Sequence, residues 1–313
     1  MTGLTTADWV NAGAPPGLRG EVPLAPFTTF GVGGAAEWFV EARTTDELVQ
    51  SVRAARALGV SVTVIGGGSN ILVSDRGVTG LVVRARTSAI VMAGGSTVRA
   101  DAGVTLNGLV RWMILRGLGG LESWAGTPGT VGGGVCGNAH YGGRLIGERL
   151  SSVSLLARSG DVLHVPAGEM AFAYDESRLQ TSGEVLLSAD FVVTPGQPVD
   201  DLRAVARASL LHRKRTQPLQ LPSAGCVFQN PDPERDRLPD GCPASAGALV
   251  DRAGLKGHRI GGALVSPVHA NFVVNAGGAT ASEIRELIDL CRHSVHEHFG
   301  VHLRTEIVCL GEF

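Results

Sequence analysis

The sequence predicts a protein of the α/β or α+β class, in which helices and strands alternate, rather than a helical bundle or a β-sandwich. Helix signals at residues 44–58 and 105–117 are separated by β-branched runs of strand length. Glycine supplies 44 of the 313 residues, about twice the usual share of ~7 %. Many tight turns, or a backbone that closely approaches a ligand, are therefore expected.

The first helix is expected to begin at Thr44, which forms a capping box with Glu47, and to end at Gly59. The apolar run 60–65 follows as a buried strand and leads into Gly66-Gly67-Gly68-Ser69-Asn70. Residues 1–25 contain three prolines and predict a loosely packed arm. Further strands are predicted at 78–84, 89–92 and 97–100, before the helix at 105–117.

The second half of the chain begins with a glycine stretch from Gly117 to Gly143 and continues into a strand-rich patch at 150–193. A helix is expected at 199–213, and the change of composition places a domain boundary near 210–222. In the last segment, Thr280 and Glu283 form a second capping box, and the helix is expected to end at Gly300. Residues 301–310 predict a final strand carrying Glu306.

The charge and cysteine content exclude several classes of protein. The formal net charge is −2 and the isoelectric point is about 6.5, so we expect no nucleic-acid partner and no anionic membrane surface. No stretch approaches the ~20 apolar residues that cross a bilayer. The five cysteines are odd in number and form no Cys-x-x-Cys pair, which argues against a disulfide framework and a zinc site. We expect a cytoplasmic protein with reduced thiols and no metal.

Two glycine-rich segments are candidate ligand surfaces. Residues 66–70 follow a strand and can present main-chain N–H groups to a phosphate. Taken alone they are more often a tight turn, because Ile71 stands where a dinucleotide fingerprint needs its third glycine. Residues 119–134 hold seven glycines in sixteen positions, interleaved with apolar side chains, which predicts an ordered, buried backbone. Two such surfaces fit a long cofactor with a pyrophosphate better than a single phosphate.

These segments, with several later motifs, resemble the UDP-N-acetylenolpyruvoylglucosamine reductase (UDP-N-acetylmuramate dehydrogenase) family. The resemblance covers roughly residues 25–313, with the motifs in order and plausibly spaced. The segments that carry it are Thr29–Gly34, Ile65–Asn70, Gly120–Gly133, Thr216–Pro218, Pro222–Pro231, Ala253–Gly257, Ile260–Gly262, His269–Phe272 and Glu306.

The resemblance implies an α+β fold with a two-subdomain FAD-binding domain of the vanillyl-alcohol-oxidase type and a C-terminal α+β substrate domain. We expect an arm at 1–25, the FAD-binding domain at 26–215 (subdomains about 26–85 and 86–215) and the substrate domain at 216–313. The family uses FAD, reduced by NADPH. The residues implied in FAD binding are Gly66, Gly67, Gly68, Ser69, Asn70, Ala125, Gly126, Thr127, Pro128, Gly129, Val131, Gly132 and Asn138.

The resemblance also implies catalytic and substrate-binding residues. The family's proton donor is usually a serine, and Cys226 occupies that position here. A thiol, with an ordinary pKa of about 8.5, is a stronger acid than an alcohol, so proton donation should be preserved. Glu306 matches the family's C-terminal catalytic glutamate. The residues implied in contacting the UDP-sugar substrate are Tyr174, Gln217 and Asn230.

Two positions depart from the family pattern. Asp175 stands where the family has an arginine that polarises the substrate carboxylate, and Ala248 stands where a lysine is frequent. An anion at position 175 would repel the developing charge, so we assign the arginine's role to Arg178, with Arg144 as the next candidate. Two alternatives stay open, a catalytically impaired flavin-binding homologue and another FAD oxidoreductase of this fold. The sequence does not define an oligomeric state.

Overall fold

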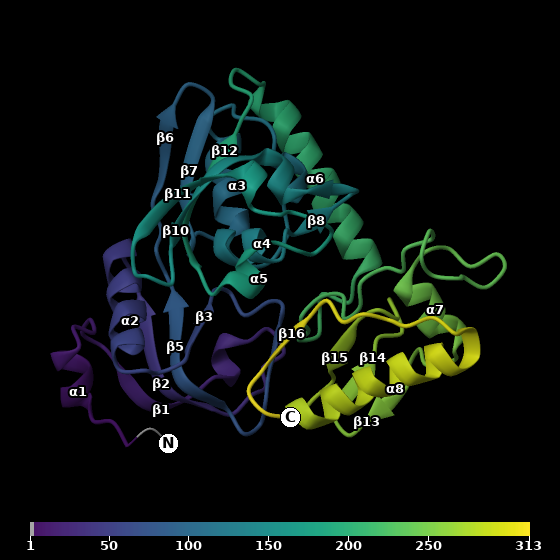
Figure 1. Ribbon diagram of the computed structural model, residues 1–313. Coiled ribbons are helices and arrows are strands. Elements are labelled where there is room, and N and C mark those ends of the chain that lie inside the picture. Colours follow the sequence, from purple (N-terminus) through teal and green to yellow (C-terminus); the bar gives the residue numbers. More distant parts are fainter. Residues whose placement is uncertain (1–2) are drawn as a thin grey trace. The chain divides into compact units, whose positions relative to one another are not determined.

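The computed structural model describes residues 3–313, which divide into two compact units (Figure 1). The first unit contains the described residues up to Val22, then Glu37–Gly67 and Thr79–Arg213. The second unit contains Pro23–Ala36, Gly68–Val78 and Lys214–Phe313. The chain therefore enters the second unit twice before its long C-terminal segment, and the division into arm, FAD-binding domain and substrate domain stays a prediction.

The N-terminal part of the first unit is built on a four-stranded sheet in the order β1-β2-β5-β3, in which β3 and β5 are parallel. Helix α2 packs its apolar face, including Leu48 and Val52, into a core shared with Trp9. The elements are α1 Thr6–Asn11, β1 Arg19–Pro23, β2 Ala35–Ala42, α2 Thr45–Ala57, β3 Val62–Ile65 and β5 Val78–Ala85, while η1 Ala25–Phe27 belongs to the second unit.

The rest of the first unit is a five-stranded sheet in the order β11-β10-β12-β7-β6, with every neighbouring pair antiparallel. A second core lies between this sheet and the helices and contains Trp124 and Phe191. Its elements are β6 Ile90–Gly94, β7 Thr97–Asp101, α3 Leu106–Ile114, η2 Glu122–Trp124, α4 Val131–Cys136, β8 His140–Tyr141, β9 Arg144–Leu145, η3 Ile146–Arg149, β10 Leu150–Leu156, β11 Val162–Pro166, η4 Ala167–Glu169, α5 Leu179–Ser182, β12 Val185–Val192 and α6 Val199–Thr216.

The second unit has its own core, lined on one side by the buried stripe of α8. Strands β13, β14 and β15 form an antiparallel sheet, and α8 contacts it. Strand β4 pairs in parallel with β16, so that residues 71–73 lie beside 308–310. The elements are β4 Ile71–Val73, α7 Ala246–Arg252, β13 Arg259–Ile260, β14 Ala263–Val265, β15 Val273–Asn275, α8 Ala281–Phe299 and β16 Val308–Leu310.

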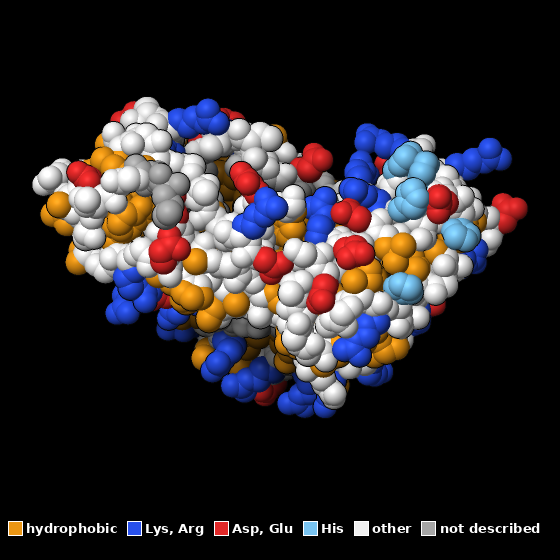
Figure 2. Space-filling model, turned by 90° about the horizontal axis from the view of Figure 1, so that it is seen from below, with side chains coloured by type: hydrophobic (Ala, Val, Ile, Leu, Met, Phe, Trp, Pro, Cys, Tyr) orange, Lys and Arg blue, Asp and Glu red, His pale blue; other side chains and the backbone are white. Residues whose placement is uncertain are grey.

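Both predicted capping boxes are confirmed. Thr44 and Glu47 start α2, and Thr280 and Glu283 start α8, which ends at Gly300 in the left-handed conformation. Charges of both signs interleave on the face shown in Figure 2, in keeping with the small net charge. No helix in residues 3–313 is long and apolar enough to span a bilayer.

Two local expectations are wrong. The N-terminal segment is not loosely packed, because α1 has its own capping box and the Trp9 side chain is fully buried. The final strand is shorter than expected, because it covers only Val308–Leu310. Before it, Thr305 makes a single antiparallel bridge with Phe228, so Glu306 lies between two short pairings rather than within a strand.

Candidate active site

The two glycine segments meet inside the first unit. A Cβ on Gly67 would lie 3.2 Å from Cα of Gly129, and a Cβ on Gly66 would overlap the side chain of Thr130. The absence of side chains at 66 and 67 therefore lets the second glycine loop pack against the first. This explains why both segments are rich in glycine, and it confirms that the second is ordered rather than a flexible linker.

The glycine turn that follows β3 offers main-chain donors. The N–H groups of Gly67, Gly68 and Ser69 donate no hydrogen bond to any residue in the described range 3–313. Gly68 is buried and has φ +67°, where a Cβ would collide with the carbonyl oxygen of Phe27. Unpaired donors in a turn of small residues suit an anionic ligand such as a pyrophosphate. This part of the predicted FAD site fits the cofactor.

The second glycine loop is held by the main chain. Val131 and Gly132 donate to the carbonyl oxygens of Val104 and Ala102, each at 2.8 Å. A Cβ on Gly132 would lie 3.1 Å from the Ala102 oxygen, so this glycine is required for packing within the protein. Of the remaining predicted residues in the loop, Ala125 and Thr127 are buried, Gly126 and Gly129 are half-buried, and Pro128 is exposed.

Sequence reasoning missed the arginine that supports this loop. The Arg213 guanidinium, on α6, donates to Thr127 Oγ1 at 2.7 Å and lies 4.2 Å from the centre of the Tyr141 ring. Arg213 is only 7 % exposed. Its positive charge is therefore buried next to the second glycine loop. No local pattern marks it, because Arg213 and Thr127 are 86 positions apart.

Asn138 has a structural task that the sequence did not indicate. Its side-chain Nδ2 donates to the Ala173 oxygen at 2.6 Å, and its Oδ1 accepts from Gly147 N at 3.0 Å. The side chain is fully buried. Both ends of the side-chain amide thus connect Asn138 to other segments of the protein.

The second unit places Cys226 and Glu306 on paired segments. The Glu306 N–H donates to the Val227 oxygen at 2.8 Å, and Gln229 N donates to the Arg304 oxygen at 2.9 Å, on either side of the Phe228–Thr305 bridge. On the other side, Asn70 Nδ2 donates to the Glu306 oxygen at 3.1 Å. Main-chain pairing with residues 227–229 and the side-chain bond from Asn70 thus bring three predicted site residues, Asn70, Cys226 and Glu306, to neighbouring positions.

Two side-chain amides, that of the buried Asn271 and that of the exposed Asn230, hold the loop that carries Cys226. Asn271 is 3 % exposed, and its side chain both accepts from Phe228 N at 2.9 Å and donates to the Phe228 oxygen at 2.8 Å. Asn230 Oδ1 accepts from Ala246 N at 3.1 Å, at the start of α7. Asn230, which is predicted to contact the substrate, therefore also holds the start of α7 in place. Gln217 is half-buried and its carbonyl oxygen accepts from Leu219 N at 2.9 Å.

The cysteines differ in their surroundings. Burial raises the pKa of the Cys291 thiol to about 12 and also raises the pKa of Cys136. Cys226 is half-buried in the loop between Ala224 and Phe228. Within residues 3–313, none of the five cysteines forms a disulfide.

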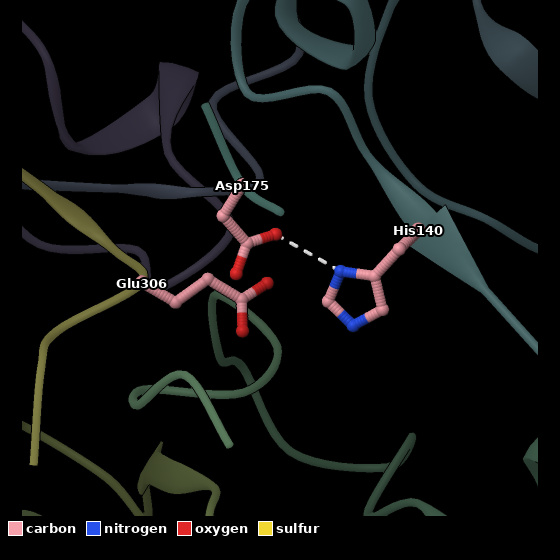
Figure 3. A group of neighbouring side chains, drawn as sticks. All are labelled: His140, Asp175 and Glu306. Carbon is pink, nitrogen blue, oxygen red and sulfur yellow. Dashed lines mark hydrogen bonds and ion pairs between the residues drawn. The ribbon is translucent and has the colours of Figure 1, made fainter. Parts of the chain in front are cut away.

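Tyr174 and Asp175 occupy the tip of a tight turn in the first unit. Ala173 and Glu176 exchange two main-chain hydrogen bonds of 3.2 Å, and Asp175 has φ +56°, a left-handed conformation that aspartate tolerates better than most residues. The Asp175 carboxylate bonds Nδ1 of His140 at 2.9 Å (Figure 3). The anion that the sequence places in the arginine position is thus paired with a histidine.

Arg178, the predicted replacement for the family arginine, is engaged elsewhere. Its guanidinium binds both carboxylate oxygens of Glu184, at 2.9 and 2.5 Å, and donates to the Glu169 oxygen at 3.3 Å. The hydrogen bonds that Arg178 donates to Glu184 raise the pKa of Arg178 and lower the pKa of Glu184. To reach a substrate, Arg178 would have to give up this bidentate pair.

Comparison with known proteins identifies both parts of the chain. Residues 36–166 match the family model described as FAD binding domain, and residues 217–310 match the C-terminal domain of UDP-N-acetylenolpyruvoylglucosamine reductase. The α+β fold with an FAD-binding domain and a separate C-terminal domain is therefore confirmed.

Relatives match over nearly the whole chain. The UDP-N-acetylenolpyruvoylglucosamine reductases of Synechococcus strains WH7803 and CC9605 are 40 % and 41 % identical, covering 94 % of this chain and 93 % and 95 % of theirs. The crystal structure of UDP-N-acetylenolpyruvylglucosamine reductase from Thermus caldophilus is similar with a TM-score of 0.78 at 32 % identity, covering 94 % of this chain and 100 % of that one. The chain belongs to the UDP-N-acetylenolpyruvoylglucosamine reductase family.

Proposed function

We propose that this protein is an FAD-dependent oxidoreductase that uses NADPH to reduce UDP-N-acetylglucosamine enolpyruvate to UDP-N-acetylmuramate, a step of peptidoglycan precursor synthesis. The proposal is supported by relatives named UDP-N-acetylenolpyruvoylglucosamine reductase, which match over more than nine-tenths of the chain. It is also supported by the pairing that brings Cys226 and Glu306 together in the second unit. This pairing is the main structural support for the proposed reaction, because it holds the segment of the proposed proton donor beside the segment of the proposed catalytic glutamate.

The first glycine turn and the second glycine loop would hold the cofactor. Gly67, Gly68 and Ser69 have main-chain donors to offer a pyrophosphate. Thr127, supported by Arg213, belongs to the loop that we assign to the flavin ring. When bound, FAD supplies a hydride carrier between NADPH and C3 of the enolpyruvyl group.

Cys226 is proposed as the proton donor. Addition of hydride at C3 leaves C2 of the enolpyruvyl group with carbanion character, and C2 must then receive a proton on one face. A placed general acid contributes about 10²–10⁴-fold to such a step. The loop around Cys226 is fixed by Asn271 and by the segment of Glu306, so the thiol is carried on a rigid frame, as a directed proton transfer requires.

Glu306 is proposed as the second catalytic group, as the family resemblance implies. The N–H of Glu306 donates to the Val227 oxygen, and the main-chain oxygen of Glu306 accepts from the Asn70 side chain. These two bonds fix the backbone position from which the carboxylate side chain extends. Tyr174, Gln217 and Asn230 are proposed to contact the UDP-sugar. Because the substrate and NADPH are cytoplasmic metabolites, we also propose a cytoplasmic location.

The test begins with the absorption spectrum of the purified protein, which should show bound flavin. NADPH oxidation is then measured with and without the enolpyruvyl substrate, and the product is identified by mass spectrometry. Substrate-dependent oxidation with formation of UDP-N-acetylmuramate is the expected result. A yellow protein that never reduces the substrate would instead select the impaired flavin-binding homologue, which Asp175 and Ala248 make the main alternative.

A further inference from the structure

A histidine in the second unit is bonded to the main chain two residues further on. Asn271 N donates to Nδ1 of His269 at 3.2 Å. The His269 ring is half-buried and packs edge-on against Phe272, with 5.1 Å between the ring centres. On another side it meets α7, where a Cβ on Gly247 would lie 3.1 Å from Cε1 of the ring. Packing therefore holds the ring with Nδ1 directed at one main-chain donor.

This bond defines the protonation state of His269. A main-chain N–H can only donate, so Nδ1 must carry a lone pair and the ring is neutral, with its proton on Nε2. Burial lowers the pKa of His269 and the positive charge of Lys256 lowers it further; together they outweigh a main-chain hydrogen bond that acts in the opposite direction. Lys256 is itself paired with Asp251 of α7 at 3.0 Å. The surroundings thus favour the form of the ring that can accept a hydrogen bond.

Asn271 connects this histidine to the loop of the proposed proton donor. Its main-chain oxygen accepts from Val227 N at 2.8 Å. Its side chain accepts from Phe228 N at 2.9 Å and donates to the Phe228 oxygen at 2.8 Å. Val227 and Phe228 directly follow Cys226. Asn271 therefore holds the two residues after Cys226, while His269 holds the N–H group of Asn271.

We propose that His269 is a positioning residue for Cys226, and that it acts only while its imidazole is neutral. The inference rests on the proposed function. An imidazolium has an N–H at both ring nitrogens, so protonation sets a ring N–H against the N–H of Asn271 and breaks their bond. The turn at 269–271 then loses this restraint, and the thiol loses its exact placement. A misplacement of about 1 Å can slow a reaction step ~10²-fold.

The consequence is an acid limit on one half of the reaction. Cys226 is needed when the substrate is reduced, and not when NADPH reduces the flavin. Because the folded-state pKa of His269 lies below the ordinary value of 6.5, the bond is intact at neutral pH and is lost as the pH falls below that value. Cys226 itself cannot cause an acid limit, since the protonated thiol is the form that donates.

The test follows the flavin by stopped-flow absorbance between about pH 5 and pH 8, the range in which histidine titrates. Two rate constants are measured, for flavin reduction by NADPH and for flavin reoxidation by the enolpyruvyl substrate. In the parent only reoxidation should slow at the acid end. His269→Leu, which has no acceptor, should slow reoxidation about 10²-fold at every pH and leave reduction by NADPH unchanged.

His269→Asn should rescue the positioning without the titration. An asparagine side chain accepts from the N–H two residues further on in an Asx turn, which is the bond that His269 makes. Reoxidation should therefore equal that of the parent at neutral pH and should lose its acid limit. His258→Asn is the matched control, because His258 is exposed and lies in the same unit; it should keep the acid limit of the parent.

An independent measurement needs no turnover. Long-range proton–nitrogen NMR of the flavin-loaded protein distinguishes the two neutral tautomers of histidine from the imidazolium. The His269 signals are assigned by their absence from the spectrum of His269→Asn. They should show the tautomer with its proton on Nε2 at neutral pH, and they should change to the imidazolium over the same pH range in which reoxidation slows.

The outcomes separate the inference from the proposed function. If the parent never reduces the enolpyruvyl substrate, the proposed function fails and the inference fails with it. If the parent is active but His269→Asn keeps the acid limit, a different group such as Glu306 causes that limit, and only the inference is overturned. An imidazolium, or a proton on Nδ1, at neutral pH would overturn it as well. Equal slowing of both half-reactions in His269→Leu would show a general structural role instead.

Discussion

The side chain of Asn70 donates a hydrogen bond of 3.1 Å to the main-chain oxygen of Glu306. Asn70 is the last residue of the first glycine turn, and Val308 N donates back to the Asn70 oxygen at 3.0 Å. One residue of the proposed cofactor-binding turn thus sets the position of the proposed catalytic glutamate.

Asn70→Ala should therefore affect catalysis as well as folding. It leaves the Glu306 carbonyl without this donor, which we expect to cost about 1 kcal/mol in the free energy of unfolding. It should also slow the reoxidation of reduced flavin by substrate. Thermal unfolding and rapid mixing measure the two effects, and an unchanged reoxidation rate would show that Glu306 does not depend on Asn70.

Cys226→Ser should stay active, because a serine at this position is what the family normally uses. Cys226→Ala should still be reduced by NADPH but should form product slowly, by about 10²–10⁴-fold, because only proton transfer to C2 is lost. Stopped-flow spectroscopy of the flavin separates the two half-reactions. Full product formation by Cys226→Ala would assign Cys226 to packing and the proton to another group.

Gly67→Val should give a protein that binds little flavin. A side chain there meets the backbone of Gly129, since even a Cβ would lie 3.2 Å from its Cα. The two loops would have to separate. The measurement is the flavin-to-protein absorbance ratio, together with circular dichroism to confirm folding. Gly168→Ala is the control, because no atom lies within 4 Å of its added Cβ; normal flavin content in Gly67→Val would contradict the two-loop site.

Alkylation of the native protein should be selective. Thiolates react and thiols do not, so Cys291, whose pKa is raised to about 12 by burial, and Cys136, whose pKa is also raised, should stay unmodified at pH 8. Iodoacetamide should modify Cys226 and inactivate the enzyme, and bound substrate should protect it. Peptide mass spectrometry locates the label. Inactivation of Cys226→Ser at the same rate would place the sensitive thiol elsewhere.

Asp75 should make stability depend on pH. Burial tends to raise its pKa, but hydrogen bonds from Ser282 and from the N–H groups of Ala281 and Ser282 outweigh burial and lower it. Because the folded-state pKa is the lower one, the stabilisation is present above the unfolded value of about 3.9 and is lost as the pH falls.

Asp75→Ala should therefore lower the free energy of unfolding by about 0.5–2 kcal/mol near neutral pH, as loss of a helix cap does. The difference from the parent should shrink as the pH is lowered toward 3. Urea unfolding at several pH values measures this. Glu286→Gln, an exposed change on the same helix, is the control, and a difference that does not vary with pH would exclude the ionised carboxylate as the cause.

Local patterns predicted the ends of helices but not the contacts between distant segments. Thr44 and Thr280 were identified correctly because a capping box is contained within four residues. The final strand was overestimated, because residues 304–306 make only an isolated bridge to residues 227–229 before the strand at 308–310. A β pattern shows that a segment can pair, and the partner is decided by the tertiary fold.

The motifs of the candidate site were predicted from the sequence, but the residues that hold those motifs in place were not. Cys226 and Glu306 were found through their motifs, and their roles remain predictions. His140, Arg213 and Asn271 were not assigned a role, because each acts on a residue 35 or more positions away. A single sequence gives no signal for such pairs when the side chains involved are common ones.

The second unit is discontinuous, and this constrains how the protein can be made. Strand β4 pairs with β16, and Asp75 caps α8, although these elements are separated by more than two hundred residues. On the ribosome, residues 68–78 emerge early but cannot complete their pairing until the last residues, 308–310, have been synthesised. A fragment that starts at residue 217 would keep the Thr280 capping box but would lack strand β4 and the Asp75 carboxylate that accepts from the first N–H groups of α8. The matched C-terminal family domain therefore does not contain the whole second unit, whose completion requires pairing between residues 71–73 and 308–310.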